Sequence, residues 1–389
     1  MKTVNIFGVT GSIGRSTLDV INFQDSSEQI KINALSANNN VELLARHSVE
    51  YNATYAVIAD SLKYQELKNA LSGTSVTPLA GSKCLKEVAE LGADWTMNAI
   101  VGFAGLEPSI ACAKTGKTLA LANKESLVCG GDLLNNTIKR YGGTLLPVDS
   151  EHSAVFQCLK NEKAASLKRI ILTASGGPFR DWPIARIKNA TLKEAVAHPN
   201  WSMGTRISID SATMFNKALE VIEAKYLFNL PITDIEVLVH PESILHSMVN
   251  FCDGSIIAQL AVPDMRGAIG FAYNYPRRLP LPVEHLKLEK IGSLNFESVD
   301  KKKFPALDIA YNSIERGALF GAIINAAKEI ALDKFILGEI KFLDITLLVQ
   351  KVLESKEIVG LENKNACKFD DILYADLLTR DIARIMKLS

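Results

Sequence analysis

The sequence has no excess charge of either sign and no long apolar run. Its 43 Lys and Arg residues balance its 43 Asp and Glu residues. No global field therefore attracts nucleic acid or a membrane surface, and an anionic ligand needs a local site. No apolar stretch reaches the roughly 20 residues that span a bilayer. The remaining composition, 48% hydrophobic and 22% charged over 389 residues, predicts a globular protein of two or three domains.

Cysteines are few and widely spaced. The six cysteines include no C-x-x-C pair, so we predict reduced thiols that are mostly buried as small apolar side chains. The chain enters a strand-like run at residues 4–7, with no signal or transit segment ahead of it. We therefore expect a cytoplasmic protein.

Short apolar runs alternate with helical patterns between residues 3 and 149. This alternation predicts right-handed β-α-β units and a parallel, doubly wound sheet. We therefore expect an α/β fold class, with a Rossmann-like domain over residues 1–149, to which the turns described below assign NADPH binding. The predicted strands are residues 4–7, 30–35, 55–59, 95–98, 118–122 and 143–148.

The rest of the chain divides into three segments. Residues 150–275 mix both patterns, which predicts an α+β domain; the motifs described below make it the catalytic domain, with a metal and substrate site and a lid loop. Prolines indicate a linker over residues 276–304, and helical spacing predicts a C-terminal α-helical bundle domain over residues 305–389. Within the catalytic segment we predict helices at 152–161 and 211–227, a strand at 169–173, and antiparallel strands at 235–239, 246–251 and 255–260.

A glycine-rich turn, Gly8–Gly14 (GVTGSIG), follows the first predicted strand. Glycine permits a tight turn and close backbone approach, while the following helix N-terminus offers N–H groups to a phosphate. The alternative is a structural turn without a ligand. We favour dinucleotide binding because the turn stands directly between strand and helix.

The second predicted strand ends in Ala37, Asn38, Asn39 and Asn40, without an acidic residue. A carboxylate there would bind the 2′-hydroxyl of NAD and repel a 2′-phosphate. Its absence favours NADP(H), although a polar turn that serves either cofactor is the alternative.

Two carboxylates, Asp149 and Glu151, close the sixth apolar run. If this stretch is extended, residues two apart point to the same side. Like charges held together in a half-buried place need a positive partner. A divalent cation is the obvious candidate, and an ordinary acidic turn is the alternative.

Three further segments carry polar residues that could bind an anion. Lys124 begins a predicted helix after residues 118–121, where it could meet an anion or be a plain surface lysine. Ser175 lies in a glycine turn that could hold a phosphate or be only a tight turn. His198 and Trp201 lie in a loop ending at Gly204, which could be a water-excluding lid or a permanently packed loop.

The predicted helix at 211–227 carries Asn216, Lys217 and Glu220 on one face. Ser211 would stand at its start, where capping and phosphate binding coincide. A surface Lys–Glu pair is the usual explanation, but neighbouring apolar residues favour an inward face.

In this order, the motifs resemble the 1-deoxy-D-xylulose 5-phosphate reductoisomerase family. The resemblance covers nearly the whole chain through GVTGSIG, ALANKES, PVDSEHSA, SGGPF, HPNWSMG, DSATMFNKALE and HPESILHSMV. It implies that Asp149, Glu151 and Glu220 hold Mg²⁺ or Mn²⁺, with Co²⁺ a further option. It also implies substrate contacts from Lys124, Ser150, Ser175, His198, Ser211, Asn216 and Lys217, with Trp201 on the lid, and NADPH contacts from Thr10, Gly11, Ser12, Ile13, Asn123, Glu125 and Gly204.

The implied reaction converts 1-deoxy-D-xylulose 5-phosphate to 2-C-methyl-D-erythritol 4-phosphate in non-mevalonate isoprenoid synthesis. A cation would act as Lewis acid and template, NADPH would supply hydride, and the resemblance implies a homodimer. Two alternatives are another two-domain NADP dehydrogenase, for example of an amino-acid semialdehyde, and a nucleotide-sensing regulatory protein without turnover. The Asn38–Asn40 turn departs from the family's usual Gly-Lys-Asn or Gly-Arg-Asn type.

Overall fold

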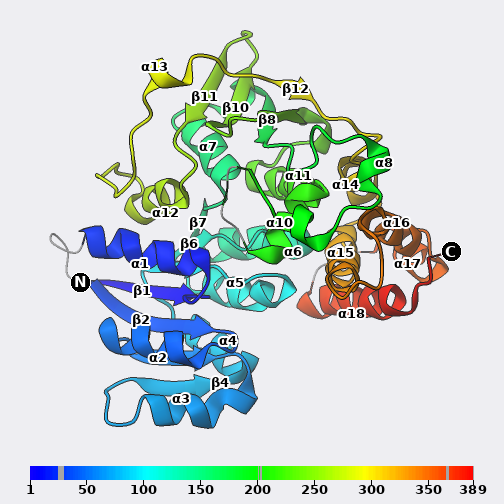
Figure 1. Cartoon of the computed structure of the whole chain (residues 1–389). Coiled ribbons are helices and arrows are strands. Elements are labelled where there is room, and N and C mark those ends of the chain that lie inside the picture. Colours follow the sequence, from blue (N-terminus) through cyan, green and yellow to red (C-terminus); the bar gives the residue numbers. More distant parts are fainter. Residues whose placement is uncertain (25–29, 200, 202–203, 365–367, 389) are drawn as a thin grey trace. The chain divides into compact units, whose positions relative to one another are not determined.

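The computed structural model describes residues 1–24, 30–199, 201, 204–364 and 368–388. The chain forms two compact units (Figure 1). Unit 1 contains residues 1–123, 134–153 and 264–284, and unit 2 contains residues 124–133, 154–263 and 285–389. The four functional segments predicted above, with boundaries at 149, 275 and 304, stay a prediction.

Unit 1 is built on a parallel seven-stranded sheet in the order β4-β3-β2-β1-β5-β6-β7. All six predicted strands are present, so the doubly wound α/β fold is confirmed. The additional strand is β4, whose four residues include Pro78; a proline that cannot donate to a ladder is tolerated at this edge position. The strands are β1 (Lys2–Phe7), β2 (Ile30–Ala37), β3 (Tyr55–Ile58), β4 (Thr77–Ala80), β5 (Trp95–Asn98), β6 (Thr118–Leu121) and β7 (Thr144–Pro147).

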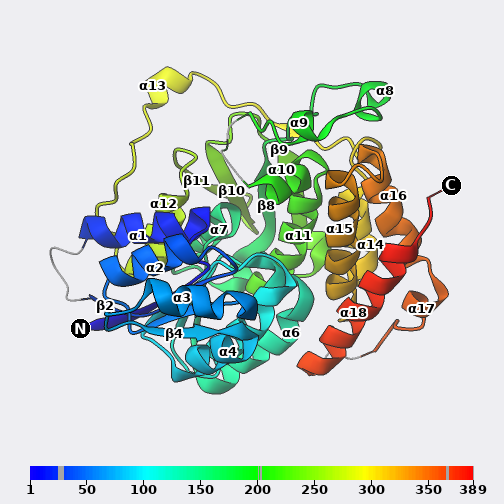
Figure 2. The same cartoon turned by 60° about the horizontal axis from the view of Figure 1, so that its bottom comes forward.

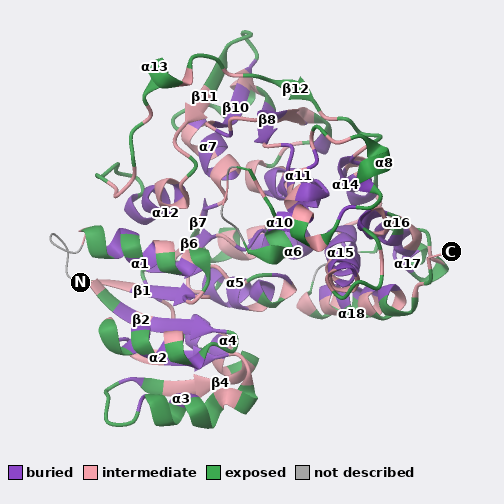
Figure 3. Ribbon diagram, in the orientation of Figure 1, coloured by how far each residue is buried: buried purple, intermediate pink, exposed green. Residues whose placement is uncertain are grey.

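Helices separate these strands, as parallel connections require. Figure 3 shows the carboxyl halves of β1 and β2 as buried, and Val4, Ile6 and Phe7 are fully inaccessible. Within the unit, the indole N–H of Trp95 donates to the Ala272 carbonyl at 3.1 Å, which ties α12 to the sheet. The helices are α1 (Ser12–Gln24), α2 (Val41–Glu50), α3 (Tyr64–Ala70), α4 (Gly81–Leu91), α5 (Leu106–Ala113) and α12 (Met265–Asn274), with 3₁₀ turns η1 (Ser61–Lys63) and η2 (Phe103–Gly105).

Two helices belong partly to each unit: α6 (Lys124–Tyr141) and α7 (Ser150–Cys158). The path of α6 is interrupted at Gly130, where φ is −136° and ψ is 34°. This break lies just before residue 134, at which the chain passes from unit 2 to unit 1.

Unit 2 contains a mixed sheet in the order β11-β10-β8-β9-β12. The predicted antiparallel pairing is correct for β10 and β11. For β9 it holds on one side only, because β9 pairs antiparallel with β12 but parallel with β8. The long connection between β8 and β9 is helical in much of its described part and returns the chain in the same direction, as a parallel crossover requires. The strands are β8 (Leu167–Ala174), β9 (Ile235–Val239), β10 (Leu245–Phe251), β11 (Ile256–Leu260) and β12 (Glu297–Ser298).

The described part of residues 305–389 is helical, as predicted, and α15 packs against α16 and α18 (Figure 2). The predicted linker also includes two short elements, α13 and β12. The helices of unit 2 are α8 (Ile184–Ile187), α9 (Leu192–Ala195), α10 (Thr205–Ala212), α11 (Phe215–Phe228), α13 (Leu288–Ile291), α14 (Ala306–Ile314), α15 (Phe320–Ile336), α16 (Phe342–Leu353), α17 (Lys356–Val359) and α18 (Phe369–Ile385), with 3₁₀ turns η3 (Ala164–Ser166) and η4 (Ile232–Asp234).

The single helix predicted over residues 211–227 is wrong. The chain breaks between α10 and α11, and Met214 has a left-handed φ of 64°. Thr213 favours the break, because its hydroxyl donates back to the Ile209 carbonyl at 2.9 Å, a bond that competes with helix propagation. Ser211 therefore lies near the end of α10, and not at the start of a helix.

Five cysteines lie in the described part of the chain and all are free thiols. Three of them are buried, one is half-buried and Cys252 is exposed, which agrees with the prediction of reduced, mostly buried thiols. Cys367 lies outside the described residues. Among the residues that the structure describes, no helix is both long enough and apolar enough to cross a bilayer.

Candidate functional site

The turn after β1 has room only for glycine at two positions. Gly8 has φ +85°, and a β-carbon there would lie 2.6 Å from the Ala99 carbonyl oxygen. A β-carbon at Gly14 would lie 2.4 Å from the Gly8 carbonyl oxygen. The N–H groups of Gly8 and Val9 both donate to the Ser36 carbonyl, at 3.1 and 2.8 Å. The turn is thus fixed against β2.

The start of α1 faces outward from this turn. Gly11 and Ser12 are exposed, while Thr10 and Ile13 are half-buried. The helix begins at Ser12, so the N–H groups of its first turn are not used within the helix. The predicted strand-turn-helix context of a phosphate-binding turn is therefore confirmed.

The end of β2 presents an asparagine run. Asn38, Asn39 and Asn40 are exposed directly after Ala37, which is buried. The Asn40 side chain accepts the Leu43 N–H at 3.0 Å and caps α2, so this asparagine has a structural role. A contact of the other two with a 2′-phosphate stays a prediction.

Two buried asparagines hold the loop that follows β5. Asn123, after β6, donates to the carbonyls of Ile100 and Gly102 at 2.6 and 3.0 Å. Asn98, the last residue of β5, donates to the Gly105 carbonyl at 2.9 Å. The sequence reasoning missed Asn98, although a polar residue that ends an apolar strand at the ligand-binding edge is a usable signal.

Asp149 and Glu151 do not lie on an extended strand, so that premise of the sequence argument is wrong. β7 ends at Pro147 and α7 begins at Ser150, and the Asp149 carbonyl accepts the Ser153 N–H at 2.8 Å. Both carboxylates are half-buried. Ser150 donates its hydroxyl to Glu151 at 2.6 Å. A helix therefore stands where a strand was expected, and the two carboxylates suit it because acidic residues are favourable at the start of a helix.

In unit 2, polar side chains surround the fully buried carboxylate of Glu220. Lys124 donates to Glu220 at 3.2 Å and to Asn216 at 2.7 Å, and the Asn216 amide donates to Glu220 at 2.5 Å. Lys217 forms an ion pair with the other oxygen of Glu220. The surface readings of Lys124 and of the Lys217–Glu220 pair are wrong, because these residues are only 8%, 3% and 0% exposed.

Ser175 and His198 also meet in unit 2. The His198 Nδ1 accepts the Trp201 N–H at 3.0 Å, so in the neutral ring the proton is on Nε2. That Nε2 lies 2.9 Å from Ser175 Oγ, and the Gly177 N–H also donates to Oγ at 3.2 Å. Burial lowers the pKa of His198, which favours this neutral form. With two donors on its oxygen, Ser175 can direct its own hydroxyl proton toward an anionic ligand.

The Ser175 turn lies against the end of α10. Gly176 and Gly177 have φ of +83° and +67°, and a β-carbon at Gly177 would lie 2.9 Å from the Ser211 carbonyl oxygen. Ser175, His198 and Ser211 therefore belong to one neighbourhood, although Ser211 reaches it from a helix end.

The predicted lid is only partly described. Trp201 is half-buried, with its ring 6.3 Å from that of His246, and Gly204 is exposed at the N-cap of α10. Asn200, Ser202 and Met203 lie outside the described residues. The choice between lid and permanently packed loop stays a prediction.

Glu125 lies in the first turn of α6 and is half-buried. Burial raises the pKa of its carboxyl, and the charges of Lys328 and Lys124 oppose this rise. The predicted role of Glu125 as an NADPH contact stays untested.

His240 has a structural role in unit 2. Its Nδ1 donates to the Asn295 carbonyl at 2.9 Å, and its Nε2 accepts the N–H groups of Ile244 and Leu245. The ring stacks on Phe296 with centroids 5.0 Å apart. His240 thus attaches the segment before β12 to the end of β9.

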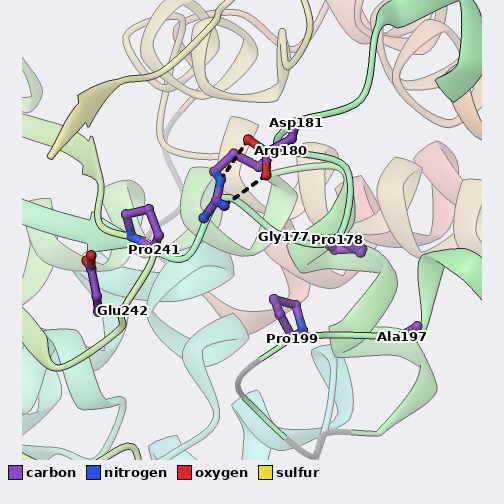
Figure 4. A pocket seen from close by; sticks show the side chains of 8 residues that line it. All are labelled: Gly177, Pro178, Arg180, Asp181, Ala197, Pro199, Pro241 and Glu242. Carbon is purple, nitrogen blue, oxygen red and sulfur yellow. Dashed lines mark hydrogen bonds and ion pairs between the residues drawn. The ribbon is translucent and has the colours of Figure 1, made fainter. Parts of the chain in front are cut away.

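A pocket of about 370 Å³ lies beside the Ser175 turn (Figure 4). Arg180 and Asp181 face each other across a two-bond ion pair, at 2.8 and 3.2 Å. Hydrogen bonding to Arg180 lowers the pKa of Asp181. The pocket is lined by Gly177, Pro178, Arg180, Asp181, Ala197, Pro199, Pro241 and Glu242.

A glycine turn on a parallel sheet, together with a second unit that contains buried lysine and glutamate side chains, is typical of two-domain nucleotide-dependent enzymes. Three family models cover most of the chain. The model of 1-deoxy-D-xylulose 5-phosphate reductoisomerase matches residues 4–131, and two C-terminal domain models of the same reductoisomerase match residues 145–228 and 260–382. The chain belongs to the 1-deoxy-D-xylulose 5-phosphate reductoisomerase family, and it is an enzyme of that activity.

Relatives match the chain over its full length. The reductoisomerase of Rhizobium etli is 49% identical over 388 residues, which cover 100% of this chain and 97% of the relative. That of Sinorhizobium medicae is 50% identical over 98% of this chain and 97% of its own length. The predicted family is confirmed, and the alternatives of a semialdehyde dehydrogenase and a regulatory protein are set aside.

Solved structures agree in fold. The reductoisomerase of Zymomonas mobilis in complex with NADPH has a TM-score of 0.90 and 46% identity, with 98% of both chains covered. A reductoisomerase in complex with NADPH, fosmidomycin and magnesium has a TM-score of 0.95 and 39% identity, with 99% of this chain and 98% of that chain covered.

Proposed function

We propose that Asp149, Glu151 and Glu220 hold one divalent cation, at which this enzyme rearranges 1-deoxy-D-xylulose 5-phosphate before reducing it with NADPH to 2-C-methyl-D-erythritol 4-phosphate. The observation that carries the proposal is the buried carboxylate of Glu220 among Lys124, Asn216 and Lys217. A charge of this kind is costly to bury unless it serves a partner or a ligand.

The donor set fits a hard cation. All three side chains offer carboxylate oxygens, the ligands that Mg²⁺ and Mn²⁺ prefer, and together they could hold a metal ion. Magnesium is present in the structure of a relative 39% identical to this chain. When bound, the cation would supply a Lewis acid and a template for the substrate's carbonyl and adjacent hydroxyl.

The substrate's phosphate is assigned to Ser175, Ser211, Asn216 and Lys217. The hydrogen bonds at Ser175 leave its hydroxyl proton to donate to a phosphate oxygen. Lys217 supplies a buried positive charge. Binding energy from this remote group would orient the reacting carbons.

The bond changes are assigned to the other end of the substrate. Lys124, with its ammonium group beside Glu220, would donate to a substrate oxygen, and Ser150 would contact a hydroxyl. His198 would hold the Ser175 hydroxyl in its donating orientation, and Trp201 would keep water away. These roles require the neutral form of His198, which its burial favours.

NADPH is assigned to the turn after β1. Thr10, Gly11, Ser12 and Ile13 would meet the pyrophosphate at the start of α1, and the run 37–40 would meet the 2′-phosphate. The Z. mobilis relative binds NADPH in its solved structure, and when bound here the cofactor would supply hydride. Asn123, Glu125 and Gly204 complete the proposed contacts.

The test is NADPH oxidation by the purified protein, followed with and without added Mg²⁺ and a chelator. We expect turnover with 1-deoxy-D-xylulose 5-phosphate that the chelator abolishes and Mg²⁺ restores. Glu220→Gln should lower kcat by about 100-fold or more, the scale of losing one group that stabilises the transition state. Glu236→Gln, an exposed glutamate of β9, is the matched control. Turnover that survives both the chelator and Glu220→Gln would exclude this metal site.

A homodimer in the cytoplasm is the remaining proposal. β11 is the outermost strand on one side of its sheet, and Ile256 and Ile257 are 54% and 42% exposed on it. An exposed apolar edge strand is a pairing surface, and a second copy of this chain would cover it. Light scattering after size exclusion should give the dimer mass, and Ile257→Lys should shift it toward the monomer; a wild-type monomer at micromolar concentration would contradict the assignment.

The free thiols support a reducing compartment such as the cytoplasm, which cell fractionation would check.

A further inference from the structure

Lys328, on α15, is a buried charged residue that the proposed reaction does not use. It is 3% exposed, and its ammonium group lies 2.9 Å from a carboxylate oxygen of Asp210 on α10. The second oxygen of Asp210 has no hydrogen-bond partner among the described residues. The ion pair is therefore the chief stabilising contact of this buried carboxylate.

Other acidic groups face the same ammonium. Burial alone would lower the pKa of Lys328, but the charges of Asp210, Glu125 and Glu329 raise it above its ordinary value. Glu329 is in turn paired with Arg380 at 2.7 Å. Lys328 thus carries a full charge and is the cation on which Asp210 depends.

The position of α10 depends strongly on such contacts. The helix has eight residues, too few to be stable alone, and it ends at Ala212, two residues before the left-handed break at Met214. Asp210 lies near its C-terminus, where a carboxylate opposes the helix dipole, so a cationic partner is needed there. Ile209 and Ala212 supply the apolar contacts.

The next residue along α10 is Ser211, which the proposed function assigns to the substrate's phosphate. We infer that Lys328 is a positioning residue for the phosphate end of the substrate site, because its ion pair with Asp210 fixes the end of α10 that carries Ser211. This inference rests on the proposed function. Displacement of α10 would also move the surface against which the Gly177 turn is packed.

The two helices are also joined at their exposed side. Arg206 of α10 forms an ion pair with Asp333 of α15, and the two side chains are 45% and 42% exposed. An exposed ion pair of this kind contributes little to the free energy of unfolding. Asp333→Asn is therefore a matched control, which removes an ion pair between the same helices without leaving a buried charge.

The experiment compares Lys328→Met, Asp210→Asn and the double variant with wild type, in steady-state kinetics and thermal unfolding. We expect Lys328→Met to raise KM for 1-deoxy-D-xylulose 5-phosphate by about ten-fold, with a smaller fall in kcat, because a group that binds ground and transition states alike is displaced. Asp210→Asn should act in the same direction. The double variant should be no worse than the singles, since one interaction is lost in each.

The double variant separates position from stability. Lys328→Met leaves a lone buried carboxylate and should lower Tm, whereas the double variant removes that charge and should recover most of the loss. Its KM should stay raised. A double variant with wild-type KM, or an equal rise of KM in Asp333→Asn, would overturn the inference. An inactive wild type would instead contradict the proposed function itself.

Discussion

Gly177 lies directly against Ser211: a β-carbon on the glycine would be 2.9 Å from the serine's carbonyl oxygen. Two segments more than thirty residues apart in the chain, the turn after β8 and the end of α10, are thereby brought into backbone contact. Each carries a hydroxyl assigned to the substrate's phosphate. The spacing of these hydroxyls depends on the absence of a side chain at residue 177.

We predict that Gly177→Ala raises KM for the phosphorylated substrate by about ten-fold, because the added carbon pushes the turn from α10 and misplaces a positioned group. Gly254→Ala is the matched control, since Gly254 also has a positive φ, +87°, but no atom within 4 Å of the added carbon. In both variants a side chain in left-handed backbone should lower the free energy of unfolding by about 1–2 kcal/mol. Substrate kinetics and denaturant unfolding check this, and equal KM values would contradict it.

At the cofactor turn, Gly14→Ala should raise KM for NADPH by about ten-fold or more. Its added carbon would lie 2.4 Å from the Gly8 carbonyl oxygen and 2.5 Å from the Val9 α-carbon, so the turn must open and its N–H groups move from the phosphate position. Gly267→Ala, on α12 with nothing within 4 Å of the new carbon, is the control. Fluorescence titration with NADPH measures the affinity, and an unchanged dissociation constant for Gly14→Ala would remove the turn from the cofactor site.

His198 predicts a dependence on pH. Burial lowers its pKa from the ordinary 6.5, so below about pH 6.5 the unfolded chain takes up a proton at this residue before the folded chain does. The free energy of unfolding should therefore fall as pH drops below about 6.5, and it should be recovered as pH rises. Protonation of Nδ1 also turns the acceptor of the Trp201 N–H into a donor, which should raise KM for substrate.

The matched variant is His198→Gln, which can still donate to Ser175 but cannot titrate. Its unfolding midpoint should change less than that of wild type between about pH 7.5 and about pH 5.5. Parallel pH profiles for the two proteins would show that another group is responsible.

Much of unit 1 was predictable because its strands are continuous apolar runs that end at polar residues, and this local pattern alone defines a parallel sheet. The break at Met214 was not predictable, because a Thr-Met pair does not by itself end a helix. The bond from the Thr213 hydroxyl to the Ile209 carbonyl and the tertiary burial of Met214 together hold the left-handed backbone. For the same reason Ser211 was placed at the wrong end of a helix.

At the site, residue types were predictable but their environments were not. Asn216, Lys217 and Glu220 share a helical face by spacing alone, and the structure confirms that face. The sequence could not show that Lys124, 96 residues before Glu220, completes the set around that carboxylate. Nor could it pair Asp210 with Lys328, because no local pattern links residues on two separate helices.

The ion pair between Lys217 and Glu220 leads to the last prediction. Both groups are buried, so Lys217→Met removes a positive charge from beside the Glu220 carboxylate. When no metal is bound, we expect this to lower the free energy of unfolding by about 3–5 kcal/mol. A bound cation would replace the missing charge, so Mg²⁺ should raise the Tm of Lys217→Met more than that of wild type. Lys225→Met, on the same helix but half-buried, should show the wild-type shift. Thermal unfolding with Mg²⁺ or chelator measures this without turnover, and an equal Mg²⁺ shift in wild type and Lys217→Met would argue that Glu220 is not a metal ligand.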